Sequence, residues 1–204
     1  MPTLLLIRHG ENDFLATQRL PGRLSGIHLN EAGHQQAAQL AQCLEKMTVR
    51  AIYSSPLERA VETAEPLAEA LHLKVILDPD LTDIDPGDWT GRSLKSLRRS
   101  VLWKGIQETP SKFQFPHGET FAQAQARIAN ALEIIENAHP DDLVAIFFHA
   151  DPIKLAVSDY LGLPLDNFQR LSVNAGSVTV MKIDGSVPKL LAANLMPPFS
   201  FPEA

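Results

Sequence analysis

Two residues at the end of an apolar run have the chemistry to act on an anion. Residues 3–7 are apolar apart from Thr3, and Arg8, His9 and Gly10 follow them directly. An arginine guanidinium offers a planar fork to phosphate oxygens, and a neutral imidazole is a nucleophile near pH 7. A glycine beside them lets a ligand approach the backbone closely. The pattern therefore indicates phosphoryl transfer through histidine.

A second apolar run, residues 144–148, also ends in a histidine, His149. Ligands of open α/β sheets bind beyond the carboxyl ends of the strands, so we expect His9 and His149 to converge there. A third, shorter run leads into a helical pattern in which Arg59 lies one turn from the start. Helical side chains lean toward the N-terminus, which aims Arg59 back at the strand ends. The two histidines and two arginines are therefore predicted to surround one phosphoryl group.

Breaking a phosphate ester also requires a proton donor, because an alkoxide leaves poorly. Residues 81–89 supply several carboxylates beside a proline-glycine turn. Each candidate also has a purely structural interpretation. Asp83 is then an ordinary turn carboxylate, His149 a hydrogen-bonded core residue, and Arg59 a solvated helix residue paired with a neighbouring glutamate.

Short apolar runs alternate with longer helical patterns, which predicts an α/β fold with a largely parallel sheet. Strands are expected at residues 3–7, 51–53, 75–77, 143–148, 178–183 and 190–194, and helices at residues 31–47, 56–71, 119–138 and 152–161, with a helical insertion between 92 and 106. Asn30 is expected to cap the first of these helices, Ser55 the second, with Pro56 at its first position, and Asp151 the last. A proline-rich tail, residues 195–204, is expected to be extended.

The composition fits one globular domain over residues 1–204. Hydrophobic side chains make up 45% of the 204 residues, enough for a full core. A formal net charge of -6, with no strong basic patch, argues against a nucleic-acid partner. The single cysteine, Cys43, excludes an internal disulfide and suits a reducing compartment. No apolar run reaches membrane-spanning length, so we expect a cytoplasmic protein without a membrane partner.

The order and spacing of these motifs resemble the histidine phosphatase superfamily, also called the phosphoglycerate mutase-like family. The matching motifs are Arg8-His9-Gly10-Glu11, Leu29-Asn30-Glu31-Ala32-Gly33, Ser55-Pro56-Leu57-Glu58-Arg59-Ala60, Asp83 with Gly87, Gly118-Glu119, and His149. They span residues 3–183. The resemblance implies a three-layer α/β/α sandwich with a mostly parallel mixed sheet.

The resemblance also implies a role for each matching residue. His9 is the nucleophile that becomes phosphorylated, while Arg8, Arg59 and His149 hold the phosphoryl oxygens. Asp83 is the general acid for the leaving oxygen and then the base for water. Since the arginines neutralise the phosphate charge, no metal or cofactor is implied.

The chain departs from the family pattern at several positions. Most relatives carry glutamate in place of Asp83, which is shorter by about 1.5 Å, so Asp85 stays open as the alternative acid. We regard Asn12, Gly22 and Glu119 as candidate substrate contacts. For Glu119, a place in the first helical turn is an equally good interpretation.

Two prolines bear on the choice between hydrolysis and isomerisation. Phosphoglycerate mutases usually carry hydroxyl side chains at the positions of Pro21 and Pro86, where this chain has none. We therefore expect a metal-independent phosphomonoesterase of the phosphatase branch that acts on a small phosphorylated metabolite, with residues 92–118 as a lid insertion. A phosphoglycerate mutase is the runner-up, and an inactive phospholigand-binding module is a third possibility. The sequence leaves the substrate and the oligomeric state open.

Overall fold

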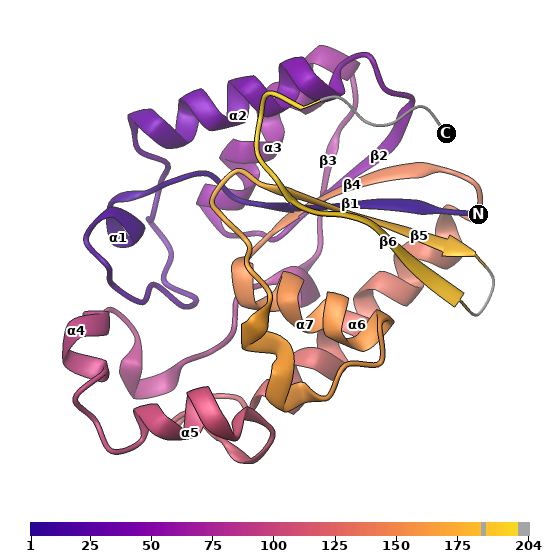
Figure 1. The fold of residues 1–204 in the computed structure, drawn as a ribbon. Helices are drawn as coiled ribbons and strands as arrows, with labels where there is room; N and C mark the ends of the chain where they lie inside the picture. The colour runs from indigo at the N-terminus through magenta and orange to yellow at the C-terminus, as the bar shows by residue number, and fades with distance from the viewer. Residues whose placement is uncertain (185–186, 200–204) are drawn as a thin grey trace.

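A six-stranded sheet runs through the middle of the protein (Figure 1). The computed structural model describes residues 1–184 and 187–199. The strands are β1 (Thr3–Arg8), β2 (Val49–Ser54), β3 (Val75–Leu77), β4 (Leu143–Phe148), β5 (Val178–Asp184) and β6 (Val187–Leu195). In the order β3-β2-β4-β1-β5-β6, the first four strands are parallel, and β5 and β6 are antiparallel to their neighbours. The predicted mixed, mostly parallel sheet is confirmed.

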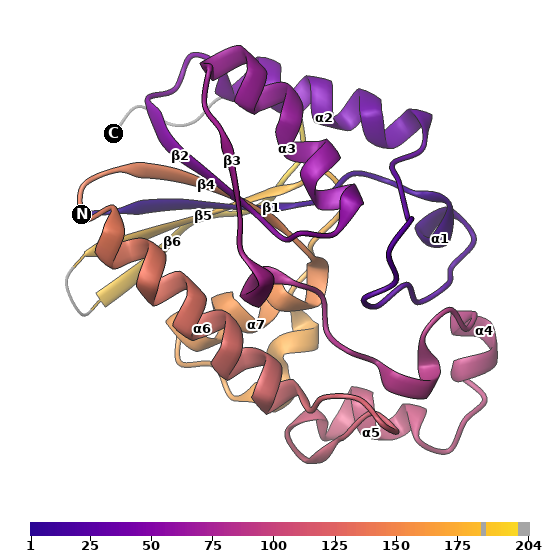
Figure 2. The ribbon, with the colours of Figure 1, turned by 180° about the vertical axis from the view of Figure 1, so that it is seen from behind.

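Helices cover both faces of this sheet. The α-helices of the described residues are α1 (Asp13–Ala16), α2 (Glu31–Leu44), α3 (Glu58–Leu71), α4 (Leu94–Leu97), α5 (Trp103–Glu108), α6 (Phe121–Ala138) and α7 (Ala150–Tyr160). Helices α2 and α3 pack on one face, and α6 and α7 on the other, as the view from behind also shows (Figure 2). The arrangement is the predicted three-layer α/β/α sandwich.

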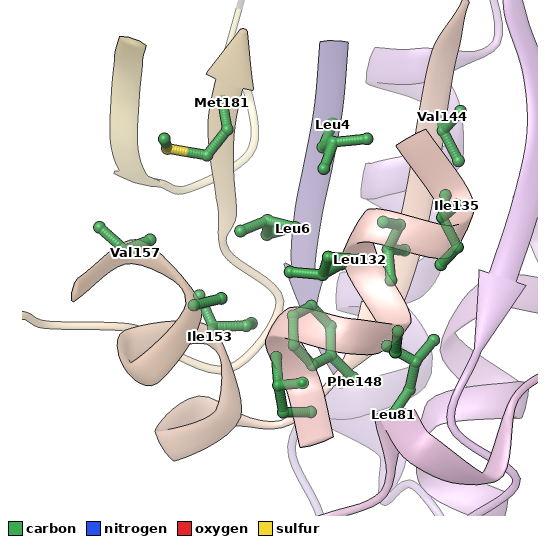
Figure 3. Packing of buried hydrophobic residues seen from close by; sticks show 14 of the residues in the cluster. Leu4, Leu6, Leu81, Leu132, Ile135, Val144, Phe148, Ile153, Val157 and Met181 are labelled. Atoms are coloured by element: carbon green, nitrogen blue, oxygen red, sulfur yellow. The ribbon is translucent and has the colours of Figure 1, made fainter. Parts of the chain in front are cut away.

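Alternate residues of β1 face opposite helical layers. Leu4 and Leu6 belong to the core under α6 and α7, where Leu132 and Ile153 also lie (Figure 3). Leu5 and Ile7 belong to the core under α2 and α3. Because side chains of a strand alternate between faces, a strand buried on both sides is apolar at every position. This explains the unbroken apolar run that ends at the candidate site.

Side-chain caps begin four of the α-helices described, α1, α2, α4 and α6. Asn30 Oδ1 accepts from the Gly33 backbone N–H at 2.9 Å, which confirms the predicted cap of α2. Helix α6 begins later than expected, because Thr120 and Gln123 form a capping box.

The other two predicted caps are wrong. Helix α3 begins at Glu58 without a side-chain cap, so neither Ser55 nor Pro56 starts it. Helix α7 begins at Ala150, which places Asp151 inside its first turn. In both places the residue that resembles a cap makes other contacts at the site.

The insertion, residues 92–118, holds α4, α5 and a short 3-10 turn. It packs on an aromatic cluster that includes Trp89, Phe113 and Phe115. A short backbone ladder joins it to the loop after α1, because the Leu20 N–H donates to the Arg92 carbonyl and the Gly91 N–H to the Leu20 carbonyl. Figure 1 shows α4 and α5 on the side of the molecule where α1 lies. The insertion and this loop thereby form one wall of the site.

Strands β3 and β4 have the expected bounds, and other expected segments differ at their ends. Strand β2 is longer at both ends than expected, α2 ends before Met47, and β6 runs on through Leu195. Part of the expected extended tail, residues 200–204, lies outside the described residues. Among the residues described, no helix is long and apolar enough to cross a membrane.

Candidate active site

The two strand-end histidines lie side by side. Strands β1 and β4 are parallel neighbours in a register that pairs Arg8 with Phe148, so the residues that follow them meet at the same edge. The His9 backbone N–H donates to the Phe148 carbonyl at 3.0 Å, and the His9 and His149 ring centroids are 5.2 Å apart. Both side chains are buried. The convergence expected from the two apolar runs is present in the structure.

The hydrogen bond made by the His9 ring leaves one of its nitrogens, Nε2, free to react. Its Nδ1 lies 2.7 Å from the Gly10 carbonyl, which can only accept, so Nδ1 carries the proton and donates. Nε2 then holds a lone pair. Burial, and next the charges of Arg59 and Arg8, lower the pKa of His9 well below its usual value. His9 is therefore a neutral imidazole at neutral pH, as a nucleophile must be.

Two arginines lie next to this ring with unused donors. The side chain of Arg59 is fully buried, and its Nη2 donates to the Gly22 carbonyl at 2.8 Å and to Asp83 Oδ2 at 3.3 Å. Arg8 Nη1 donates to the Val173 carbonyl at 2.7 Å. Within the described part of the chain, Arg59 Nε, Arg59 Nη1 and Arg8 Nε are buried and have no partner. Buried N–H groups of a cation are costly to leave unpaired, so the site is built for an anion.

Ser55, which was expected to cap a helix, determines which ring nitrogen of His149 carries the proton. Ser55 Oγ lies 2.9 Å from His149 Nε2 and accepts from the Leu57 backbone N–H at 3.4 Å. The serine hydroxyl hydrogen is then free to donate to Nε2, which leaves the proton on Nδ1. That nitrogen is buried, lacks a partner among the described residues and lies 3.8 Å from Asp83 Oδ2. His149 can thus present an N–H to an anion.

Asp83 is the carboxylate that lies among these groups. Burial, and to a lesser extent the nearby charge of Asp151, raises its pKa to about 6 against the opposing effect of Arg59. Asp85 is used differently, because its Oδ1 accepts from the Gly87 backbone N–H at 2.9 Å and it does not line the pocket. The geometry therefore favours Asp83 over Asp85 as a proton donor.

The backbone that carries Asp83 is held by two arginines that the sequence does not identify, and Glu119 joins them instead of contacting substrate. Arg23 Nε donates to the Asp83 carbonyl at 2.8 Å, and Arg127 Nη1 donates to the Thr82 carbonyl at 3.0 Å. Glu119 joins the two arginines at 2.9 and 2.8 Å. We call Arg23, Glu119 and Arg127 the acid-loop clamp. Glu119 lies before α6 rather than in its first turn, and it does not line the pocket.

The other two candidate substrate contacts also have structural partners. Asn12 is fully buried, and its Oδ1 caps α1 by accepting from the Leu15 backbone N–H at 3.0 Å. Gly22 has a φ of 53°, and a Cβ there would lie 2.4 Å from Pro86 Cδ. Its carbonyl positions Arg59, as described above. Neither residue lines the pocket.

A pocket of about 510 Å3 opens in front of His9, Arg8 and Asp83, which all line it. Arg59 and His149 do not line it, but both lie close to Asp83, with Arg59 Nη2 at 3.3 Å and His149 Nδ1 at 3.8 Å from Asp83 Oδ2. The pocket is much larger than one phosphate group and has the size of a small-molecule site. Within the described ranges, no group of three or more His, Cys, Asp or Glu side chains is placed to hold a metal ion.

We expect orthophosphate or vanadate to stabilise the protein through the unpaired donors of Arg8, Arg59 and His149. At 100 times its Kd, a ligand adds about 2.7 kcal/mol to the free energy of unfolding, which is a rise of about 5–10 °C in Tm for a chain of this size. Thermal unfolding with and without the anion measures it. Arg59→Met should lose most of the shift, whereas Arg50→Met, at an exposed position, should keep it. An equal shift in all three proteins would place the anion elsewhere.

Comparison with known proteins agrees with this arrangement. The model of the histidine phosphatase superfamily (branch 1) matches residues 4–196. Phosphoserine phosphatase 1 of Hydrogenobacter thermophilus is 30% identical over 197 residues, which cover 96% of this chain and 93% of that protein. A probable phosphoglycerate mutase, GpmB of Erwinia tasmaniensis, is 30% identical, with 88% of this chain and 84% of that protein covered.

Solved structures show the same fold. YhfR of Bacillus stearothermophilus has a TM-score of 0.87 at 29% identity, with 93% of this chain and 95% of that chain covered. The relatives thus include both phosphatases and mutases, and they support a phosphatase here. Matched over nearly its whole length, the chain belongs to the histidine phosphatase superfamily, branch 1.

Proposed function

We propose that the protein is a metal-independent phosphomonoesterase that hydrolyses a small phosphorylated metabolite through a phosphohistidine on His9. One observation carries the proposal. A buried, neutral His9 with an unprotonated Nε2 lies beside two arginines whose buried N–H groups have no partner among the described residues. A nucleophile next to unsatisfied cationic donors suits attack on a phosphoryl group.

In the first step, His9 Nε2 forms a bond to phosphorus and the ester P–O bond breaks. Asp83 gives its proton to the departing oxygen, so that an alcohol leaves rather than an alkoxide. Arg8, Arg59 and the His149 Nδ1–H hold the phosphoryl oxygens and stabilise their charge. The product is phosphohistidine with Asp83 ionised.

In the second step, water attacks phosphorus and the P–N bond to His9 breaks. The Asp83 carboxylate takes the proton from the water, which returns the acid to its starting state. Orthophosphate then leaves. The chain's own arginines supply the positive charge for both steps.

An isomerase is the second candidate, because relatives at 30% identity carry the name of probable phosphoglycerate mutase. Pro21 lines the pocket but offers neither a hydroxyl nor a backbone N–H, and Pro86 packs against Gly22. These positions therefore give no hydrogen bond to a glycerate carboxylate, which favours hydrolysis.

Two assays separate the candidates. Orthophosphate release from p-nitrophenyl phosphate reports hydrolysis, and formation of 2-phosphoglycerate from 3-phosphoglycerate with 2,3-bisphosphoglycerate present reports mutase activity. We expect release of orthophosphate and little isomerisation. Faster isomerisation than hydrolysis would reverse the assignment, and no turnover in either assay would indicate an inactive binding module.

The pH dependence of the first turnover should follow Asp83. Burial raises the pKa of Asp83 to about 6, and a bound phosphate dianion raises it further, so the acid form is lost as the pH rises through and above that value. Alcohol release from an alkyl phosphate should therefore slow on the alkaline side. The lowered pKa of His9 keeps the nucleophile neutral to well below pH 6.5.

Rapid-quench measurements of the first turnover between pH 5 and 9, roughly the range in which such groups titrate, test this profile. The substrate phosphate titrates alike in wild type and in Asp83→Asn, so its effect on the rate is present in both. The decline in rate at alkaline pH that Asp83 causes should be absent from Asp83→Asn. A decline of equal size in Asp83→Asn would show that another group supplies the proton.

A further inference from the structure

The pocket in front of His9 has an apolar wall whose role the phosphoryl chemistry does not explain. The wall is formed by α1 with the loop after it and by the insertion, and the ladder at Leu20 joins the two. Its members are Leu15, Leu20, Leu94, Trp103, Ile106 and Phe115.

This wall is firmly built. Trp103 is half-buried and stacks on Trp89, with ring centroids 6.2 Å apart and an angle of 14° between the planes. Trp89 meets Phe115 edge-on at 5.6 Å, and Phe115 belongs to the same aromatic cluster as Phe121. Such aromatic packing fixes the shape of the surface before any ligand arrives. The apolar wall is therefore a standing feature and needs no ligand to form.

The opposite wall is polar but nearly neutral. Lys154 Nζ lies 3.1 Å from Asp151 Oδ1 and 3.2 Å from Gln169 Oε1, so its charge is already compensated. Arg19, on the loop after α1, also lines the pocket, and its Nε donates to the Gly91 carbonyl at 2.9 Å. Beyond the cations of the phosphoryl site, Arg19 is the lining cation for which no carboxylate partner is found among the described residues. Apart from this one guanidinium, the polar part of the lining therefore adds little net charge next to the phosphoryl site.

We propose that the alcohol released at this site carries an apolar body of aromatic size, in preference to a short polar acid such as serine or glycerate. This inference rests on the proposed phosphomonoesterase activity. A pocket of about 510 Å3 leaves most of its volume to the alcohol. A three-carbon acid would leave the apolar wall wet, whereas an aryl-bearing alcohol would cover it.

A series of primary alkyl phosphates tests the inference at constant leaving-group chemistry. The series runs from ethyl to 2-phenylethyl to 2-(1-naphthyl)ethyl phosphate, with O-phosphoserine as the polar member. We expect kcat/KM to rise by about tenfold or more between the first and the last, because each added apolar group gains contact with a preformed hydrophobic wall. The kcat/KM of O-phosphoserine should be close to that of ethyl phosphate.

A pair of variants then assigns the preference to the wall. Trp103→Ala should reduce the naphthylethyl-to-ethyl ratio of kcat/KM by about tenfold. Leu102→Ala is the matched control, since Leu102 is 44% exposed and does not line the pocket, and its ratio should stay within about twofold.

The outcomes separate this inference from the function on which it rests. If wild type releases no orthophosphate even from p-nitrophenyl phosphate, or His9→Ala releases it equally fast, the proposed function fails. If that release depends on His9 but the alkyl series is flat, the substrate inference alone is overturned. It is also overturned if O-phosphoserine is the best substrate and its kcat/KM drops tenfold or more in Arg19→Gln.

Discussion

Replacing His9 by alanine is expected to lower kcat by about 10⁴-fold or more on every phosphomonoester, because the variant has no atom to accept the phosphoryl group. Its partner His149 cannot substitute, since its Nε2 is engaged by Ser55 and its Nδ1 carries the proton that faces Asp83. Steady-state release of orthophosphate measures the loss. Brief exposure to a labelled substrate should leave acid-labile label on wild type and none on His9→Ala.

The matched control is His34→Ala, an exposed histidine on α2, which should keep turnover within about twofold of wild type. The fold of His9→Ala is checked by thermal unfolding with orthophosphate. The anion should still raise the Tm of this variant, because Arg8 and Arg59 remain in place. An acid-labile label of equal yield in His9→Ala would contradict the mechanism, and a missing orthophosphate effect would indicate a damaged site instead.

The side chains whose placement in the fold could be predicted from the sequence are those fixed by regular elements. An apolar strand of a parallel sheet ends at a known edge, so His9 and His149 had to approach each other once β1 and β4 were neighbours. Arg59 is the second residue of α3 and not one turn into it as expected, but its side chain still leans toward the N-terminus of the helix and so toward the strand ends. In these cases local periodicity and sheet topology determine the position together.

The acid-loop clamp could not be predicted in this way. Arg23, Glu119 and Arg127 come from a loop, a segment before α6 and α6 itself, and they meet only through the tertiary fold. None of them follows a strand or belongs to a motif whose geometry is local. Their effect is to hold the short irregular segment around Asp83, where no helix or strand would fix a side chain. The backbone that carries the Asp83 carboxylate is thus held from two sides, by Arg23 and by Arg127.

The two wrong helix caps have a common cause. Ser55 and Asp151 each stand where a cap is expected from the sequence, and each is used at the site instead. Ser55 hydrogen-bonds His149, and Asp151 pairs with Lys154 in the pocket wall. A capping bond is worth about 1 kcal/mol, so a functional contact can displace it at little cost to stability. Local capping signals are therefore weakest at the residues that follow functional strands.

Changing Asp83 to asparagine should slow the first step for substrates whose leaving group needs a proton and not for those whose leaving group does not. For an alkyl phosphate, loss of the general acid is expected to slow the first step by about 10²–10⁴-fold, since the alkoxide then departs unprotonated. Asparagine keeps an oxygen that can accept from Arg59, so the packing of the site changes little. Alcohol release in a single turnover measures this effect.

With p-nitrophenyl phosphate the same variant should behave differently. Nitrophenolate leaves without a proton, so phosphorylation of His9 proceeds, but hydrolysis of the phosphohistidine lacks its base. We expect a burst of one nitrophenol per active site followed by slow turnover, and a stable acid-labile label on the protein.

Asp85→Asn is the matched control for this variant, because an asparagine oxygen still accepts from the Gly87 N–H while the charge is removed. Its rates should stay within about threefold of wild type. If Asp85→Asn shows the burst and Asp83→Asn does not, Asp85 is the acid despite its position outside the pocket. If neither shows it, water attacks the phosphohistidine without a carboxylate base, and the assignment of Asp83 as the base is wrong.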